Sequence, residues 1–178
     1  VKACSGRAGI RAGENVLIIG AGGGMGLHAI QAARACGGRV IAAIRSNRTA
    51  AAARDAGADV VFSTQEHDTV QYVKGITDGL GADVVLDFVS QRDTLPPSIN
   101  ALAPGGRLVI MGYFPKGGVL ETPTWLFIEE ITVTGNRSAG RQEIADTVAL
   151  IRQGRIKPLI SRVFPLQEAA AADRAFEA

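Results

Sequence analysis

Short apolar runs rich in β-branched residues alternate with stretches of helical apolar spacing along nearly the whole chain. The strand-like runs lie at 15–19, 39–44, 59–62, 82–89, 107–112 and 131–135. The helix-like stretches lie at 26–38, 47–57, 67–77, 94–102, 141–154 and from about residue 166. Parallel strands need helical crossovers, so this alternation predicts an α/β fold with a doubly wound, six-stranded parallel sheet and helices on both faces. We assign residues 1–178 to one domain of this kind.

Composition narrows the class of partner. The net charge of +2 is too small to predict a nucleic-acid or membrane surface as the main partner, and an aromatic content of 5% argues against base stacking. No apolar run is long enough to cross a bilayer and no leader opens the chain, which predicts a cytoplasmic protein. Cys4 and Cys36 lack C-x-x-C spacing, so neither a structural zinc site nor a disulfide scaffold is expected.

The segment IIGAGGGMGL, residues 18–27, holds five glycines between the first strand and the first helix. Such a turn lies at the carboxyl ends of the strands, where a helix N-terminus offers unpaired N–H groups to a phosphate. The frame that fits, with alanine in the first place, predicts a cradle for the pyrophosphate of a dinucleotide. The residues of this cradle are Ala21, Gly22, Gly23, Gly24, Met25 and Gly26. A turn that serves only helix packing is the competing interpretation.

Two other nucleotide-binding classes fit less well. A second glycine frame, Gly20-x-x-x-Gly24-x-Gly26, is typical of short-chain dehydrogenases, but neither tyrosine has the Tyr-x-x-x-Lys spacing of that family. A methyltransferase that binds S-adenosylmethionine would favour acidic residues before the glycines and after the second strand, and isoleucines stand in those places. The sequence therefore favours a dinucleotide.

The end of the second strand favours NADPH over NADH. NAD-binding versions of this fold carry an acidic residue there to bind the ribose 2′-hydroxyl, whereas Ile44 occupies that place here. Arg45, Ser46 and Arg48 follow directly. Because a guanidinium binds a phosphate in bidentate fashion, we expect these three residues to surround the adenosine 2′-phosphate. The alternative is that the arginines are ordinary solvated residues at a helix start.

Several segments resemble the medium-chain dehydrogenase/reductase superfamily. They are AGENVLIIGAGGGMGLHAIQAARACGGRVIAAIRSN, GAD (57–59), DGLGADVVLDFVS (78–90), ALAPGGRLVIMG (101–112) and EITVTGNR (130–137). The likeness covers nearly the whole chain and points to the branches of zinc-type alcohol dehydrogenases, quinone oxidoreductases and enoyl reductases. It implies the cofactor-binding domain alone, as a fragment of a longer enzyme, because the GroES-like catalytic domain of the superfamily has no counterpart in these residues.

The resemblance also implies cofactor contacts after the fourth, fifth and sixth strands. By position it places Val89 and Ser90 at the adenine ribose, Met111, Gly112 and Tyr113 beside the nicotinamide, and Asn136, Arg137 and Ser138 at its carboxamide. His28 and His67 are expected to be packed or solvated. We predict no catalytic or metal-binding residue in this chain.

The activity that the resemblance implies is hydride transfer between NADPH and a carbonyl or an activated alkene, with the small-molecule substrate held together with the absent catalytic domain. The chain alone should bind the cofactor with little turnover, and any zinc would belong to the absent domain. A non-catalytic dinucleotide-binding or sensor module on the same fold is the alternative. Residues 116–130 contain an apolar strip of Trp125, Leu126 and Phe127 beside an edge strand, and packing of this strip on the sheet is one interpretation. The resemblance favours the other, a homodimer through the 116–130 edge.

Overall fold

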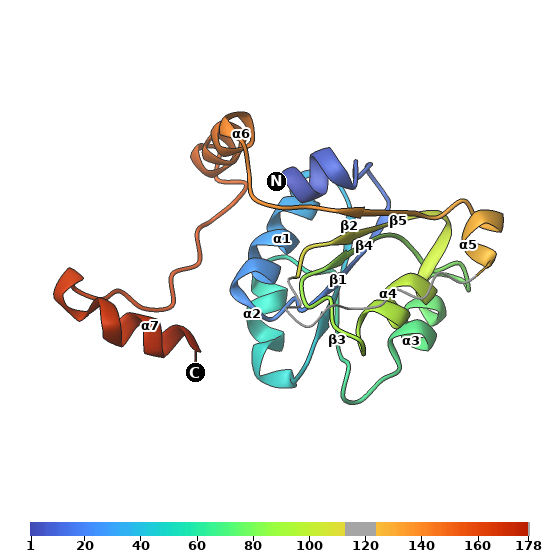
Figure 1. Ribbon diagram of the computed structural model, residues 1–178, viewed down its shortest axis with the longest axis horizontal. Coiled ribbons are helices and arrows are strands. Elements are labelled where there is room, and N and C mark those ends of the chain that lie inside the picture. Colours follow the sequence, from blue (N-terminus) through green and yellow to red (C-terminus); the bar gives the residue numbers. More distant parts are fainter. Residues whose placement is uncertain (113–123, 178) are drawn as a thin grey trace.

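Six parallel strands form one sheet in the order β3-β2-β1-β4-β5-β6 in the computed structural model, which describes residues 1–112 and 124–177 (Figure 1). The strands are β1 (Asn15–Ile19), β2 (Arg39–Ile44), β3 (Val60–Ser63), β4 (Ala82–Asp87), β5 (Leu102–Ile110) and β6 (Thr132–Gly135). The helical segments are η1 (Lys2–Arg7), α1 (Gly24–Ala35), η2 (Asn47–Thr49), α2 (Ala50–Asp55), α3 (Thr69–Gly75), α4 (Leu95–Asn100), α5 (Trp125–Ile128), α6 (Arg141–Arg152), η3 (Leu166–Glu168) and α7 (Ala169–Glu177). The predicted doubly wound α/β fold with six parallel strands is confirmed.

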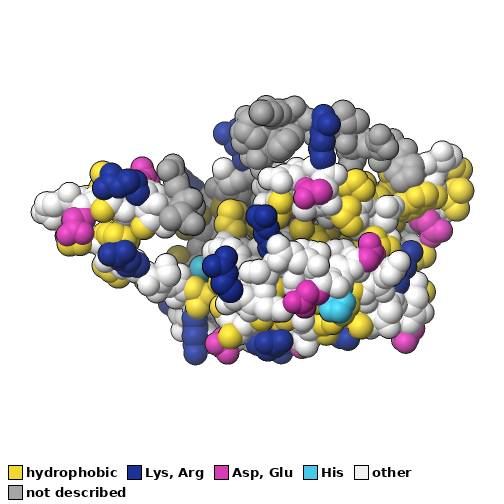
Figure 2. Space-filling view, turned by 90° about the horizontal axis from the view of Figure 1, so that it is seen from below, with side chains coloured by type: hydrophobic (Ala, Val, Ile, Leu, Met, Phe, Trp, Pro, Cys, Tyr) yellow, Lys and Arg dark blue, Asp and Glu magenta, His cyan; other side chains and the backbone are white. Residues whose placement is uncertain are grey.

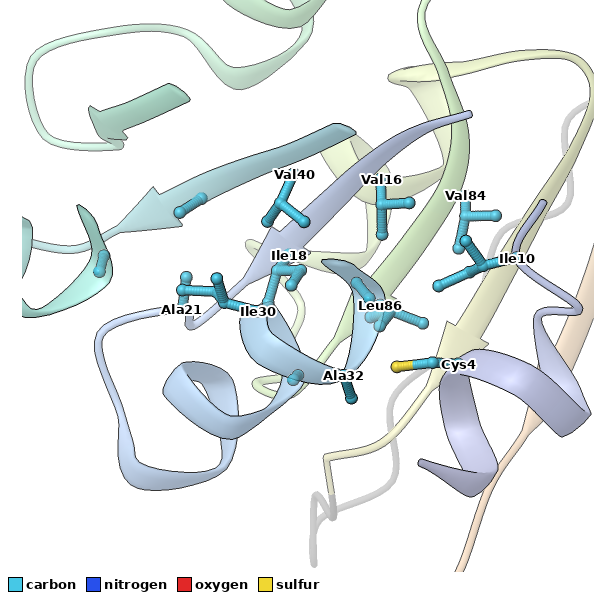
Figure 3. Packing of buried hydrophobic residues seen from close by; sticks show 14 of the residues in the cluster. Cys4, Ile10, Val16, Ile18, Ala21, Ile30, Ala32, Val40, Val84 and Leu86 are labelled. Atoms are coloured by element: carbon cyan, nitrogen blue, oxygen red, sulfur yellow. The ribbon is translucent and has the colours of Figure 1, made fainter. Parts of the chain in front are cut away.

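Side chains alternate between the two faces of the sheet and so build two apolar layers. Val16 and Ile18 of β1 pack on one face with residues of η1, α1 and α2, and Leu86 of β4 joins them (Figure 3). Leu17 and Ile19 point to the other face, toward residues of α3 and α4. Because both faces are covered, the central strands contain continuous apolar runs, VLII in β1 and VVL in β4, which is the pattern that the sequence displays.

The strand order reverses between β1 and β4, which pair directly with each other. From β1 the chain moves through β2 to β3 on one side, and then from β4 through β5 to β6 on the other. The turns that leave β1 and β4 therefore diverge, and a crevice opens at the carboxyl ends of these two strands. Gly20 and Val89 face each other there, since a Cβ at Gly20 would lie 2.9 Å from Cγ2 of Val89.

Strand β4 is shorter than the predicted run at 82–89, because Asp87 turns the chain. Its buried carboxylate Oδ1 accepts hydrogen bonds from the backbone N–H groups of Val89 at 2.8 Å and Ser90 at 2.7 Å. Those donors cannot then continue the ladder toward β5. Ser90 adopts a left-handed conformation with φ of 53°, which closes this turn.

Strand β5 contains the turn that its Pro-Gly-Gly segment predicts. Its pairing with β4 shifts register between Ala82 and Val84, whose partners on β5 are Leu102 and Arg107. Gly105 has a positive φ of 72°, which favours glycine, and its N–H donates to the carbonyl of Glu129 at 2.7 Å. The irregularity therefore sits at the end of the sheet opposite the crevice.

The N-terminal turn η1 and the segment after α6 were not predicted to pack on α1. Cys4 of η1 is buried in the core layer beside α1. Gln31 of α1 exchanges two hydrogen bonds with Lys157, of 3.1 and 2.7 Å, so the extended segment after α6 is tied to the helix. Helix α7 then lies away from the sheet at the end of a long extended stretch (Figure 1).

Charged side chains of both signs are interspersed over the face shown in Figure 2. This mixture agrees with the small net charge of +2. None of the helices in the described residues has the length and apolar character that a bilayer crossing requires.

The burial of the core side chains predicts how much each leucine-to-alanine substitution lowers the free energy of unfolding. Leu86 is fully buried, so Leu86→Ala is expected to lower the free energy of unfolding by about 2–5 kcal/mol through lost contacts and a cavity. Leu166 is 87% exposed, and the same substitution there should change it by less than about 0.5 kcal/mol. Urea unfolding of both variants measures the difference, and equal losses would contradict the assignment of the core.

Candidate functional site

Two glycines of the turn between β1 and α1 permit close packing within the protein. A Cβ at Gly26 would lie 2.3 Å from the carbonyl oxygen of Gly20 and 2.6 Å from Cα of Ala21. A Cβ at Gly22 would lie 2.2 Å from Oγ1 of Thr49, which belongs to the loop after β2. Both distances are far below van der Waals contact, so the packing interpretation of the glycine turn holds for these two positions.

Gly23 and Gly24 have a different environment, because they border open space. A Cβ at Gly24 would meet no heavy atom within 4 Å, and a Cβ at Gly23 would meet only the Gly20 carbonyl oxygen, at 3.6 Å. Met25, which follows, is 64% exposed. The predicted cradle is therefore divided: some of its glycines hold the turn together, and Gly23 and Gly24 leave room for a ligand.

The N-terminus of α1 is open to an anion. Gly23 is the N-cap and supplies no side-chain cap, and the first turn contains no acidic residue. The N–H groups of Gly24, Met25 and Gly26 have no hydrogen-bond partner among the described residues, whereas Leu27 already donates to the Gly23 carbonyl at 2.9 Å. Three free donors and the positive end of a 12-residue helix dipole fit a pyrophosphate.

The loop after β2 carries two free guanidinium groups. Arg45 and Arg48 are exposed, and Ser46 between them is partly buried. Within residues 1–112 and 124–177 the ion pairs join Arg34 to Asp59 and Arg107 to Glu14, so the side chains of Arg45 and Arg48 are unpaired there. Thr49, which follows Arg48 in this loop, packs against Gly22 of the glycine turn, so the loop lies beside the predicted pyrophosphate cradle.

The end of β4 is held by a buried hydrogen-bond network that sequence reasoning missed. Oδ2 of Asp87 accepts from the hydroxyl of Ser98 on α4 at 2.9 Å, in addition to the two backbone donors at Oδ1. Ser90 is buried, and its hydroxyl donates to the Asp87 carbonyl and accepts from the N–H of Gly112. Ser90 therefore turns its hydroxyl into the protein and joins the ends of β4 and β5. The sequence feature that could have indicated this network is Asp87 itself, an aspartate inside an otherwise apolar run of a predicted strand.

A cleft of about 680 Å³ opens beside the N-terminus of α1. Its lining includes Gly24 and Met25 from the glycine turn, Met111 after β5, and Asn136, Arg137 and Ser138 after β6. Residues of η1, α1 and α6, together with Phe88, form most of the remaining wall. The structure thus brings Met111 and residues 136–138, which were predicted for the nicotinamide subsite, to one cleft. Gly112 does not line it and packs against the backbone of Val89, and Tyr113 lies outside the described residues.

Asn136 lines this cleft and carries an unsatisfied polar atom. Its Oδ1 is buried and has no hydrogen-bond partner among the described residues. Its own N–H donates to the carbonyl of Ile110 at 3.0 Å, which fixes the residue at the carboxyl end of β5. A buried amide oxygen without a donor costs about 1–3 kcal/mol, so a ligand that donates here would relieve that cost.

The residues around the cleft that carry reactive side chains are occupied or shielded. Burial raises the pKa of the Cys4 thiol to about 12, so Cys4 is protonated at neutral pH and is no nucleophile. The Nδ1 atom of His28 donates to the Gly24 carbonyl at 2.7 Å, and its Nε2 accepts from the N–H of Leu159 at 3.1 Å. No group of three His, Cys, Asp or Glu side chains suited to a metal ion occurs in the described part of the chain.

Comparisons with known proteins agree with this arrangement. The sequence profile of the zinc-binding dehydrogenases matches residues 24–153. An NAD-dependent alcohol dehydrogenase of Sulfurisphaera tokodaii is 31% identical over 92% of the chain, and a quinone oxidoreductase of Rattus norvegicus is 30% identical over 91%. The crystal structure of a zinc-binding dehydrogenase from Sinorhizobium meliloti, bound to NADP, superposes with a TM-score of 0.78 at 28% identity, over 85% of this chain and 45% of that one.

The chain spans about half the length of the curated relatives that it matches. The alignments cover 47% of the alcohol dehydrogenase and 50% of the quinone oxidoreductase. The family profile begins at the first residue of α1 and includes strands β2 to β6.

The division of the glycines predicts unequal effects of one added methyl group on the free energy of unfolding. Gly26→Ala should lower the free energy of unfolding by about 1–3 kcal/mol, because its Cβ would collide with the Gly20–Ala21 backbone. Gly24→Ala should change it by less than about 0.5 kcal/mol, since its Cβ meets open space. Urea unfolding compares the two variants. If Gly24→Ala were the more destabilised, the geometry of the turn described above would be wrong.

Proposed function

Because the chain belongs to the zinc-binding dehydrogenases, as a cofactor-binding domain of the medium-chain dehydrogenase/reductase superfamily, we propose that it binds NADPH for an oxidoreductase. The reaction is hydride transfer to or from a carbonyl or an activated alkene. The observation that carries this proposal is the open N-terminus of α1, whose first N–H groups have no partner among the described residues and whose Gly24 and Met25 line a cleft.

The pyrophosphate would lie over Gly23 and Gly24, where no protein atom occupies the position of a side chain. The N–H groups of Gly24 and Met25 would donate to its oxygens, and the helix dipole would stabilise their negative charge. Gly22 and Gly26 contribute through packing. They let Thr49 and the backbone at the end of β1 pack closely against the turn, which fixes the position of Gly23 and Gly24.

The adenosine end would lie along the loop after β2. Arg45 and Arg48, which have no ion-pair partner among the described residues, would bind a 2′-phosphate, with Ser46 between them. The absence of an acid at Ile44 removes the repulsion that a 2′-phosphate meets in NAD-binding versions of the fold. Val89 at the end of β4 would flank the ribose. Ser90 would not contact it through its hydroxyl, which joins the ends of β4 and β5.

The nicotinamide end would enter the cleft lined by Met111 and Asn136. The unsatisfied Oδ1 of Asn136 suits the N–H₂ group of a carboxamide, and such a bond would orient the ring. Met111 and Phe88 would exclude water from the ring face. The bound dinucleotide supplies or accepts a hydride at C4 of its nicotinamide, and the protein binds, orients and shields it.

The rest of the enzyme is part of the same proposal. The chain would supply the cofactor domain, and a GroES-like catalytic domain would supply the substrate site and any zinc. A homodimer would use the 116–130 edge beside β6, of which residues 116–123 lie outside the described part. Phe127 and Ile128 of α5, which are 76% and 64% exposed, offer apolar surface there. The cytoplasmic location expected from the sequence stays a prediction.

Calorimetric titration of the 178-residue chain with NADPH and NADH tests the coenzyme site. Arg45→Ala and Arg48→Ala are each expected to weaken NADPH binding about tenfold, because each removes a charge-assisted contact to the 2′-phosphate worth about 1.4 kcal/mol. NADH binding should change less than about threefold.

Arg54→Ala serves as the matched control, because Arg54 is exposed on α2 outside the proposed phosphate site. Its binding of both dinucleotides should equal that of the unmodified chain. Equal weakening of NADPH and NADH by the Arg45 and Arg48 substitutions would contradict the assignment of the 2′-phosphate site. Failure of the unmodified chain to bind either dinucleotide would contradict the proposed function itself.

A further inference from the structure

The loop after β3 is fastened to the loop after β2 at the adenosine end of the proposed site. The two strands pair in parallel, with Ile44 opposite Ser63. Beyond that pair, the hydroxyl of Ser63 donates to the Arg45 carbonyl at 3.2 Å, and the N–H of Thr64 donates to the Ile44 carbonyl at 2.9 Å. These bonds place residues 64–67 directly beside the arginine-bearing loop.

One carboxylate is held at this junction. Nδ2 of Asn47 donates to Oε1 of Glu66 at 2.7 Å, and Asn47 stands between Ser46 and Arg48 in the chain. The backbone of Glu66 is fixed as well, since its N–H donates to the carbonyl of Ser63 at 3.2 Å. The end of β2 carries no acid of its own, and Glu66 is the carboxylate that the neighbouring loop holds against the arginine-bearing loop.

Glu66 does not neutralise the charge of Arg45 or Arg48 by forming an ion pair with either. No nitrogen of Arg45 or Arg48 lies within 4 Å of its carboxylate in the described structure, because the ion pairs found there involve other residues. The adenosine end of the proposed site therefore combines two unpaired guanidinium groups with one nearby carboxylate that forms no ion pair. His67 and Asp68 follow in the same loop, and the Asp68 carboxylate is turned to the N–H of Gln71 at the start of α3.

We infer that Glu66, held by Asn47, sets the coenzyme preference of this site by opposing the 2′-phosphate that Arg45 and Arg48 attract. The inference rests on the proposed function. A 2′-phosphate carries up to two negative charges near neutral pH, whereas the 2′-hydroxyl of NADH is neutral. A carboxylate held beside the arginine-bearing loop therefore opposes the binding of NADPH and leaves the binding of NADH nearly unchanged, to a degree that salt screens. The site therefore prefers NADPH over NADH less strongly than it would with the two arginines alone.

Glu66→Gln isolates the charge, because a glutamine oxygen still accepts the hydrogen bond from Asn47. Titrations of the 178-residue chain with NADPH and with NADH give the ratio of the two dissociation constants. The substitution is expected to tighten NADPH binding about threefold, which is the scale of an exposed charge interaction, and to change NADH binding less than about 1.5-fold. The NADPH gain should shrink at high ionic strength.

Asp55→Asn is the matched control, because it removes an exposed carboxylate from the last residue of α2, whereas the arginine-bearing loop precedes that helix. It should leave the ratio unchanged. An unchanged ratio in Glu66→Gln, or an equal shift for both dinucleotides, would overturn the inference and leave the proposed function intact. A chain that binds neither dinucleotide would overturn both.

Discussion

The contact of Gly26 with the Gly20–Ala21 backbone determines where helix α1 stands relative to strand β1. A side chain at this position would lie 2.3 Å from a carbonyl oxygen and would push the helix away from the sheet. With glycine there, the helix begins at Gly24, one short turn after β1, and its first N–H groups have no partner among the described residues. The proposed anion site thus depends on one close contact between backbone segments.

The opposite wall of the crevice depends on a different interaction, the buried carboxylate of Asp87. Backbone N–H groups and the hydroxyl of Ser98 satisfy its two oxygens, so the cost of burying it is offset by hydrogen bonds. Ser90 then carries the connection to the N–H of Gly112. The ends of β4 and β5 are fixed together, and with them the position of Met111 at the cleft. A rigid rim of this kind suits the orientation of a flat ring.

The sequence predicted the architecture well because its signals are strong and local. Alternating apolar runs indicated all six strands, and the glycine density marked the turn after β1. What it did not separate was the role of each glycine, since packing against Thr49 and contact with open space depend on segments far apart in the chain. Asp87 and Glu66 were missed for the same reason: their significance lies in the partners that the fold brings to them, Ser98 from α4 and Asn47 from the neighbouring loop. The turn η1 was missed because its packing on α1 has no periodic signature.

The most direct test of the account is a titration of the ¹⁵N-labelled chain with NADPH, followed by amide chemical shifts. Because the pyrophosphate would accept hydrogen bonds from the first turn of α1, the amide resonances of Gly24, Met25 and Gly26 are expected to show the largest shifts, with saturation. Smaller shifts should follow at Arg45 and Arg48. Large shifts confined to other parts of the chain, with the α1 amides unchanged, would contradict the claim that this helix N-terminus is the dinucleotide site.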